Sequence, residues 1–272
     1  MKYLLIIFFF CCSSSVFSEN NYYKSNFKKE DLINLKKSWI YKSNIFKDTQ
    51  TKPTSYKDKI VYLDGYKTLR VLSLFSGKEI CKNSGKKDRG YHRGIGIYKK
   101  NKDEVYAVFV RHSKVILVNI INCEEKKIDF KAPKKTAISA PILVNNNIAY
   151  ILLNGAAPIA LNLDNGKILW RAKIEKKILK NLKKKNLNNE IKWDVWGGGV
   201  LDLKYNQLIF STANAKPSWT SEKRFGPNLF YNSVVSVDIN TGKYKWHFQE
   251  IEHDLWNLDL AAPPILVDID QM

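Results

Sequence analysis

The chain repeats one arrangement of apolar and polar positions. A run that alternates apolar and polar residues reaches a Gly-Lys turn and then resumes with an apolar or aromatic residue, over 71–80, 159–170 and 235–246. Alternation with a period of two is typical of a half-buried strand. A glycine in the turn supplies the positive φ that a tight hairpin needs. The pattern therefore predicts three strand–turn–strand units.

Further candidate strands lie between and beside these units. A degenerate copy of the unit covers 115–125, and other apolar runs cover 59–63, 105–110, 142–152 and 208–212. The turns recur at about 45 residues, the spacing of four-stranded β-propeller blades, which bury their faces against one another. We therefore predict an all-β chain with about four to five blades. Trp39, before the first unit, is interpreted as the closing aromatic of another unit.

The net positive charge bears on which partners the protein could bind. The chain has 45 Lys and Arg against 26 Asp and Glu, a net charge of +19, which invites a nucleic-acid interpretation. The lysines, however, lie at strand ends and in loops, including a run over 176–185. We therefore expect a solvated basic surface and no nucleic-acid partner, with attraction to an anionic membrane face as the next candidate.

The N-terminus predicts export. Lys2 precedes an apolar run over 3–10 and a serine cluster, as in a secretory signal, and the run is too short to span a membrane. We predict a signal peptide over 1–18 and a propeller domain over 19–272. An oxidising compartment permits a disulfide between Cys81 and Cys123, although the sequence cannot place the two within reach.

The most specific motifs lie in the last third of the chain. They are Trp-Asp-Val-Trp-Gly-Gly-Gly at 193–199, Ser-Thr-Ala-Asn at 211–214 and His-Asp-Leu-Trp-Asn-Leu-Asp at 253–259, and the run continues to Asp268. In order and spacing they resemble the quinoprotein alcohol and glucose dehydrogenases, which use pyrroloquinoline quinone (PQQ). The Asp-x-x-Thr-Gly-Lys-x-x-Trp repeat is similar to the tryptophan-docking repeat of the same propellers, in which the tryptophan packs between adjacent blades.

The resemblance implies a cofactor site. Trp196 matches the tryptophan that forms a floor under the quinone, where an indole gives a wide rigid surface. Arg93 is similar to the arginine that grips a cofactor carboxylate. Asn214 matches an asparagine that ligates Ca²⁺. The family implies a periplasmic enzyme that oxidises a small alcohol or sugar and passes electrons to a quinone or cytochrome.

The sequence departs from the family at the site. Asn257 occupies the position of the catalytic aspartate, and an amide cannot act as a general base. Asn257 could still ligate calcium, and Asp254 and Asp259 are candidate replacements for the base. On a strand, Asp259 would share a face with Asn257 and Asp254 would lie opposite. The family's calcium-binding glutamate is also absent, and Asn154, which lies near its position, is the candidate to offer an oxygen to the metal instead.

Length leaves two interpretations open. The family propeller has about eight blades, so we expect either a truncated or inactive form or a second chain that completes the ring. The alternative function is a non-enzymatic propeller of the same repeats that acts as a binding scaffold or outer-membrane assembly factor.

Overall fold

Four antiparallel sheets of four strands follow one another along the chain in the computed structural model. The model describes residues 28–43, 45, 49–84, 92–112, 114–128, 130, 132–133, 136–173, 193–220, 222 and 224–267. A short helix, α1 (Lys29–Ile33), precedes the sheets. The predicted signal peptide over 1–18 lies outside the described residues, and so does Asp268. Nothing among the described residues forms a helix with the length and apolar character that crossing a membrane requires.

Each sheet is a meander in which neighbouring strands pair in chain order. Blade 1 consists of β1 (Thr54–Tyr56), β2 (Lys59–Leu63), β3 (Leu69–Ser73) and β4 (Glu79–Asn83). Blade 2 consists of β5 (Gly96–Lys99), β6 (Val105–Arg111), β7 (Lys114–Asn119) and β8 (Glu125–Ile128). Blade 3 consists of β9 (Leu143–Asn145), β10 (Ile148–Ile151), β11 (Ile159–Asn162) and β12 (Ile168–Arg171). Blade 4 consists of β13 (Gly199–Asp202), β14 (Gln207–Ser211), β15 (Ser233–Asp238) and β16 (Tyr244–Gln249).

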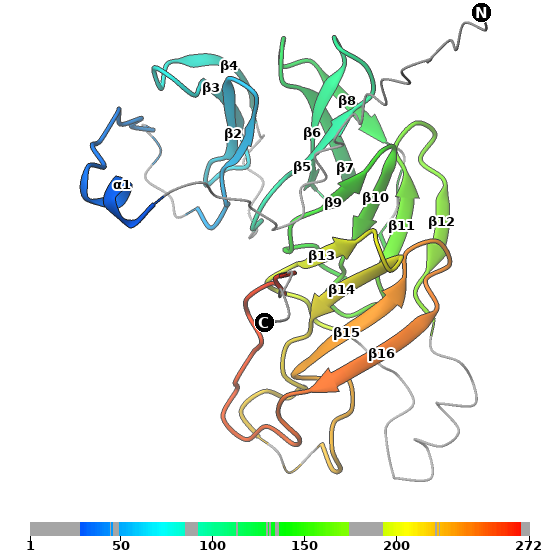
Figure 1. Ribbon diagram of the computed structural model, residues 1–272. Coiled ribbons are helices and arrows are strands. Elements are labelled where there is room, and N and C mark those ends of the chain that lie inside the picture. The colour runs from blue at the N-terminus through cyan, green and yellow to red at the C-terminus, as the bar shows by residue number, and fades with distance from the viewer. Residues whose placement is uncertain are drawn as a thin grey trace, which may run out of the picture.

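The four blades lie in an arc in chain order (Figure 1). Neighbouring first strands meet, since β5 lies against β9 and β9 against β13. Apolar side chains fill the space between neighbouring blades. One buried cluster joins blades 1 and 2, a second joins blades 2 and 3, and a third joins blades 3 and 4. The observed architecture confirms the predicted all-β fold of four-stranded propeller blades.

The predicted strands agree with the observed ones, with one difference. The run over 142–152 was expected as a single strand, but it forms the hairpin β9–β10. Three consecutive asparagines, 145–147, lie at the turn, and Asn146 has a φ of 52°. Asparagine tolerates this left-handed conformation better than most residues do, so the polar triplet breaks an otherwise apolar run.

The meander gives every blade two distinct ends. The turn end carries the turn between the third and fourth strands, at Gly77, Cys123, Gly166 and Gly242. The connector end carries the segment that precedes each first strand, at 92–95, 137–142 and 193–198 in blades 2, 3 and 4. It also carries the turn between the second and third strands, because antiparallel neighbours reverse direction at each turn. All residues that the family resemblance assigns to a cofactor site lie at the connector end.

Candidate functional site

Hydrogen bonds join the connectors of successive blades. The main-chain amide of Lys52, before blade 1, donates to the carbonyl of Arg93, before blade 2, at 3.0 Å. The amide of Arg93 donates in turn to the carbonyl of Ser139, before blade 3, at 2.8 Å. Each connector is therefore positioned by the next, and the chain can bring together site residues that are far apart in sequence.

Arg93 and Trp196 meet at this end. The Arg93 guanidinium carbon lies 5.3 Å from the centroid of the Trp196 ring, within the range of a cation–π contact. Both side chains are partly buried. The Arg93 Nε is buried and has no hydrogen-bond partner among the described residues. Two residues separated by more than a hundred positions thus form one surface that combines a positive charge with an aromatic plane.

Pro141 lies between the segments that carry these two residues. A Cβ atom on Gly94 would lie 3.0 Å from the Pro141 ring, and one on Gly198 would lie 3.1 Å from it. Such distances are shorter than ordinary van der Waals contact, so both positions favour glycine. Packing on both sides of one rigid ring fixes the spacing between Arg93 and Trp196.

Asn154 holds the Trp196 segment in place. Its amide oxygen accepts the Val195 main-chain N–H at 2.8 Å, and its amide nitrogen donates to the Ser139 hydroxyl at 2.8 Å. The next amide, of Gly155, donates to the carbonyl of Trp193 at 2.8 Å. These bonds give Asn154 a positioning role, while metal ligation by its oxygen stays a prediction.

Asn214 forms hydrogen bonds with two of the predicted site residues. Its side-chain amide donates to the Asn257 Oδ1 at 2.7 Å, and its main-chain N–H donates to the Asp259 Oδ1 at 2.9 Å. Asn214 is 2% exposed, whereas Asn257 and Asp259 are partly buried. The structure thus brings Asn257 and Asp259 to the same residue, Asn214, which lies shortly after β14.

The expected reason for this proximity was wrong. Residues 251–267, all of which the structure describes, form turns and bends and contain no strand. The alternating faces of a strand therefore do not apply, and Asn257 has a φ of 60°. Asn257 and Asp259 converge because the chain turns back between them and Asn214.

Asp254 stabilises that turn from inside. Its two carboxylate oxygens accept the main-chain N–H groups of Trp256 and Leu258, each at 2.8 Å. Asp254 is 2% exposed, and its carbonyl accepts a hydrogen bond from the Arg224 guanidinium. Its carboxylate is therefore occupied in shaping the loop that carries Asn257, and its candidacy as a base has no support from this geometry.

The segment after the turn packs against Gly197, the neighbour of Trp196 in the chain. A Cβ on Gly197 would lie 2.3 Å from the carbonyl oxygen of Ala261, and the Ser211 hydroxyl donates to the carbonyl of Ala262 at 2.8 Å. This close approach requires glycine at position 197. The Ala213 amide also donates to the carbonyl of Asp194 at 2.7 Å, so the chain around Asn214 is joined to the segment that carries Trp196.

All three side chains of the group around Asn214 carry oxygen atoms. Two amides and the Asp259 carboxylate lie together, and no group of three or more His, Cys, Asp or Glu side chains that could hold a metal ion occurs in the described part of the chain, this site included. Oxygen donors suit a hard cation such as Ca²⁺, and a set with one formal charge binds it less tightly than an acidic set.

Sequence reasoning missed the supporting residues. Ser139 and Pro141 were not recognised because neither carries a distinctive motif. His92 is 3% exposed and accepts the main-chain N–H of Val110 at 3.1 Å, so it anchors the loop of Arg93. Arg224 is 5% exposed and donates to the carbonyl of Pro217 at 2.9 Å. The only one of these residues with a signal in the sequence is Arg224, which is an arginine in a loop of mostly polar residues.

Comparison with known proteins agrees with these observations. Residues 156–272 match the family model described as "Glucose/ethanol/alcohol dehydrogenase, beta-propeller domain". The quinohemoprotein alcohol dehydrogenase of Comamonas testosteroni is 38% identical over 86 residues, which are 28% of this chain and 12% of that protein. The quinohemoprotein alcohol dehydrogenase ADH-IIG of Pseudomonas putida is 25% identical over 85% of this chain and 36% of its own length. The chain spans less than half the length of these relatives.

Solved structures agree on the fold. A europium-containing methanol dehydrogenase superposes with a TM-score of 0.68 at 15% identity, over 88% of this chain and 48% of that one. The quinohemoprotein alcohol dehydrogenase of C. testosteroni superposes with a TM-score of 0.64 at 19% identity, over 82% of this chain and 38% of that one. Residues 156–272 therefore match the β-propeller domain of the PQQ-type glucose and alcohol dehydrogenases, and the chain has the fold of part of such a propeller.

Proposed function

We propose that the connector end binds PQQ together with Ca²⁺, and that the chain supplies this half-site to a dehydrogenase that oxidises an alcohol or sugar. The observation that carries the proposal is the contact between Arg93 and Trp196, at 5.3 Å from guanidinium carbon to ring centroid. A flat, acidic cofactor needs an aromatic surface and a fixed cation, and these two residues supply both.

The residues present fit the cofactor in two respects. The buried Nε of Arg93 has no partner among the described residues, and burying an unpaired donor costs roughly 1–3 kcal/mol. A cofactor carboxylate would satisfy it. The oxygens of Asn214, Asn257 and Asp259 are the donors that would hold calcium. When bound, PQQ would accept the electrons of the substrate, and calcium would polarise its carbonyl.

The site lacks the aspartate that removes the substrate proton in the family. Asn257 occupies the family's base position and has no basic lone pair. Asp259 is the carboxylate that accepts a hydrogen bond from the main-chain N–H of the same residue, Asn214. We therefore assign the base role to Asp259 if the chain turns over substrate. In that case the effect of Asn257 is to orient Asn214 through their 2.7 Å hydrogen bond.

The setting of the protein is part of the proposal. The disulfide between Cys81 and Cys123 supports an exported, periplasmic protein, because such bonds persist in oxidising compartments. The electron acceptor would be a quinone or cytochrome. The remaining blades of the ring would come from a second chain or from further sequence of the same protein.

Reconstitution tests the proposal. The purified protein is titrated with PQQ in the presence and absence of Ca²⁺, and quinone absorbance and dye-linked oxidation of alcohols and glucose are measured. We expect calcium-dependent binding in the micromolar range, with little turnover in the wild type. Asn257→Asp should then raise turnover without loss of binding. No binding at micromolar protein would refute the cofactor site and favour the scaffold function.

A further inference from the structure

At two places, a tryptophan packs on the turn glycine of the blade that follows it in the chain. The Trp170 indole N–H, in blade 3, donates to the carbonyl of Ile239 in blade 4 at 2.9 Å. A Cβ on Gly242, three residues after Ile239, would lie 2.5 Å from the Trp170 ring. Trp39 repeats this arrangement on blade 1, with its N–H 2.9 Å from the carbonyl of Leu74 and its ring 2.5 Å from a Cβ on Gly77.

The docking turn has the same backbone in all four blades. At its key position the main-chain N–H donates to the carbonyl four residues earlier, at 2.8–2.9 Å, and φ is positive. The residues at this position and their φ values are Gly77 (66°), Cys123 (60°), Gly166 (73°) and Gly242 (68°). Cys123 therefore occupies in blade 2 the position that glycine occupies in the other three. A cysteine there adopts a left-handed conformation that glycine takes more readily.

Cys81 occupies the docking tryptophan's position in blade 1. In three blades the fourth residue after the key position pairs with the residue six before it, beside a β-bulge. These pairs are Cys81 with Val71, Trp170 with Ala160, and Trp246 with Ser236. Cys81 thus stands where Trp170 and Trp246 stand in their own blades.

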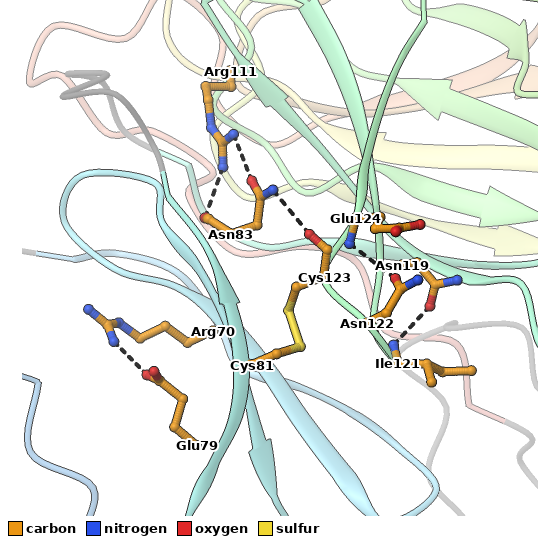
Figure 2. The surroundings of a disulfide bond; sticks show 10 residues. All are labelled: Arg70, Glu79, Cys81, Asn83, Arg111, Asn119, Ile121, Asn122, Cys123 and Glu124. Carbon is orange, nitrogen blue, oxygen red and sulfur yellow. Dashed lines mark hydrogen bonds and ion pairs between the residues drawn. A yellow bond between two sulfur atoms is a disulfide. The ribbon is translucent and has the colours of Figure 1, made fainter.

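These positions meet at the junction of blades 1 and 2, where Cys81 and Cys123 form a disulfide with a Cα–Cα distance of 6.0 Å (Figure 2). We propose that this disulfide is a covalent replacement of the tryptophan–glycine dock that joins neighbouring blades. The attachment of blade 1 to blade 2 thereby becomes dependent on the redox state, whereas the attachment of blade 3 to blade 4 does not.

Polar contacts surround the disulfide and continue across the junction. The Asn83 amide, in β4, donates to the carbonyl of Cys123 at 3.2 Å (Figure 2). Arg111, in blade 2, donates to the Asn83 Oδ1 at 3.0 Å and forms an ion pair with Glu125 at 2.8 Å. These contacts, together with the apolar cluster between the blades, keep the junction assembled when the disulfide is broken, so reduction should loosen it rather than unfold the protein.

A tryptophan introduced by design tests the equivalence of positions. The variant C81W/C123G rebuilds the dock, and C81A/C123G is its matched control because both have glycine in the left-handed position. Thermal unfolding is followed with and without dithiothreitol, whose two thiols become a cyclic disulfide while Cys81 and Cys123 each take up a hydrogen atom.

We expect reduction to lower the wild-type Tm by roughly 5–10 °C. The C81W/C123G variant should lose this sensitivity and melt within about 3 °C of the oxidised wild type. The C81A/C123G variant should melt at or below the reduced wild type. Equal melting temperatures for the two variants would overturn the proposal, as would a wild-type Tm unaffected by reduction under conditions that free both thiols.

The reverse exchange is an independent test at the other junction. The variant W170C/G242C places cysteines at the corresponding positions of blades 3 and 4. We expect a disulfide to form between them on mild oxidation, observed as a cross-linked peptide by mass spectrometry and as the loss of two titratable thiols. Two free thiols in the folded, oxidised protein would show that the positions are not equivalent.

Discussion

The two ends of the blades differ in what they repeat. At the turn end, all four blades share one backbone, with the same hydrogen bond and a φ of 60–73° at Gly77, Cys123, Gly166 and Gly242. At the connector end, the candidate side chains differ from blade to blade: Arg93 precedes blade 2, Asn154 lies in blade 3, and Trp196 and Asn214 belong to blade 4. Repetition at one end holds the blades together, and its absence at the other leaves room for a site.

This contrast separates stability from chemistry. A residue at the turn end joins two blades, so its substitution should lower the free energy of unfolding. The buried Nε of Arg93 has no hydrogen-bond partner among the described residues, which costs free energy in the isolated protein that the proposed cofactor would offset. Substitutions at the two ends should therefore have opposite signatures in stability and in binding.

The largest effect is expected at the tryptophan dock. Trp170→Ala removes an 8%-exposed indole and its hydrogen bond to Ile239, and should lower the free energy of unfolding by about 3–5 kcal/mol. Trp219, 78% exposed, is the matched control, and Trp219→Ala should cost less than about 0.5 kcal/mol. Urea titration measures both, and similar losses for the two variants would remove the distinction between docked and exposed indoles.

Gly242→Ala should have the next largest effect. The added Cβ would lie 2.5 Å from Trp170, and φ is 68°, so we expect a loss of about 2–3 kcal/mol in urea titration. In the Trp170→Ala background the clash disappears and only the backbone strain remains, at about 1 kcal/mol. A cost that is the same in both backgrounds would mean that the glycine is needed for its φ alone.

The smallest effect concerns pH. Burial lowers the pKa of His247 below its usual value of 6.5. The unfolded chain therefore binds a proton more readily, so the stability contributed by neutral His247 is present above pH 6.5 and is lost as pH falls toward the folded-state pKa. His247→Gln should flatten the stability between pH 7 and 5 by at most about 1 kcal/mol. An unchanged pH profile would show that His247 does not titrate differently on folding.

Much of the turn end could be predicted from the sequence. The Gly-Lys turns and closing tryptophans recur, and each recurrence supports the others. The equivalence of the disulfide to a tryptophan–glycine contact could not be predicted, because Cys81 and Cys123 lie in the two copies that differ most from the repeat. Only the shared backbone reveals that they occupy the same positions as a tryptophan and a glycine.

The sequence suggested candidate residues at the connector end but not their geometry. The motifs identified Trp196, Asn214 and Asn257 through resemblance alone. The assumption of a strand over 254–259 failed because Asp254 hydrogen-bonds two main-chain amides and closes a turn. Supporting residues such as Pro141 act through packing, which no local pattern encodes.

The most direct test of the contrast is PQQ binding by a variant at the connector end. Arg93→Met keeps much of the side chain and removes the charge, and Arg171→Met, at an exposed position of β12, is its matched control. In titrations with PQQ at saturating Ca²⁺, we expect Arg93→Met to weaken binding by roughly 30- to 100-fold, the effect of about 2–3 kcal/mol, with no loss of Tm. Arg171→Met should bind like the wild type. Equal affinity of Arg93→Met and wild type would contradict the assignment of the connector end as the cofactor site.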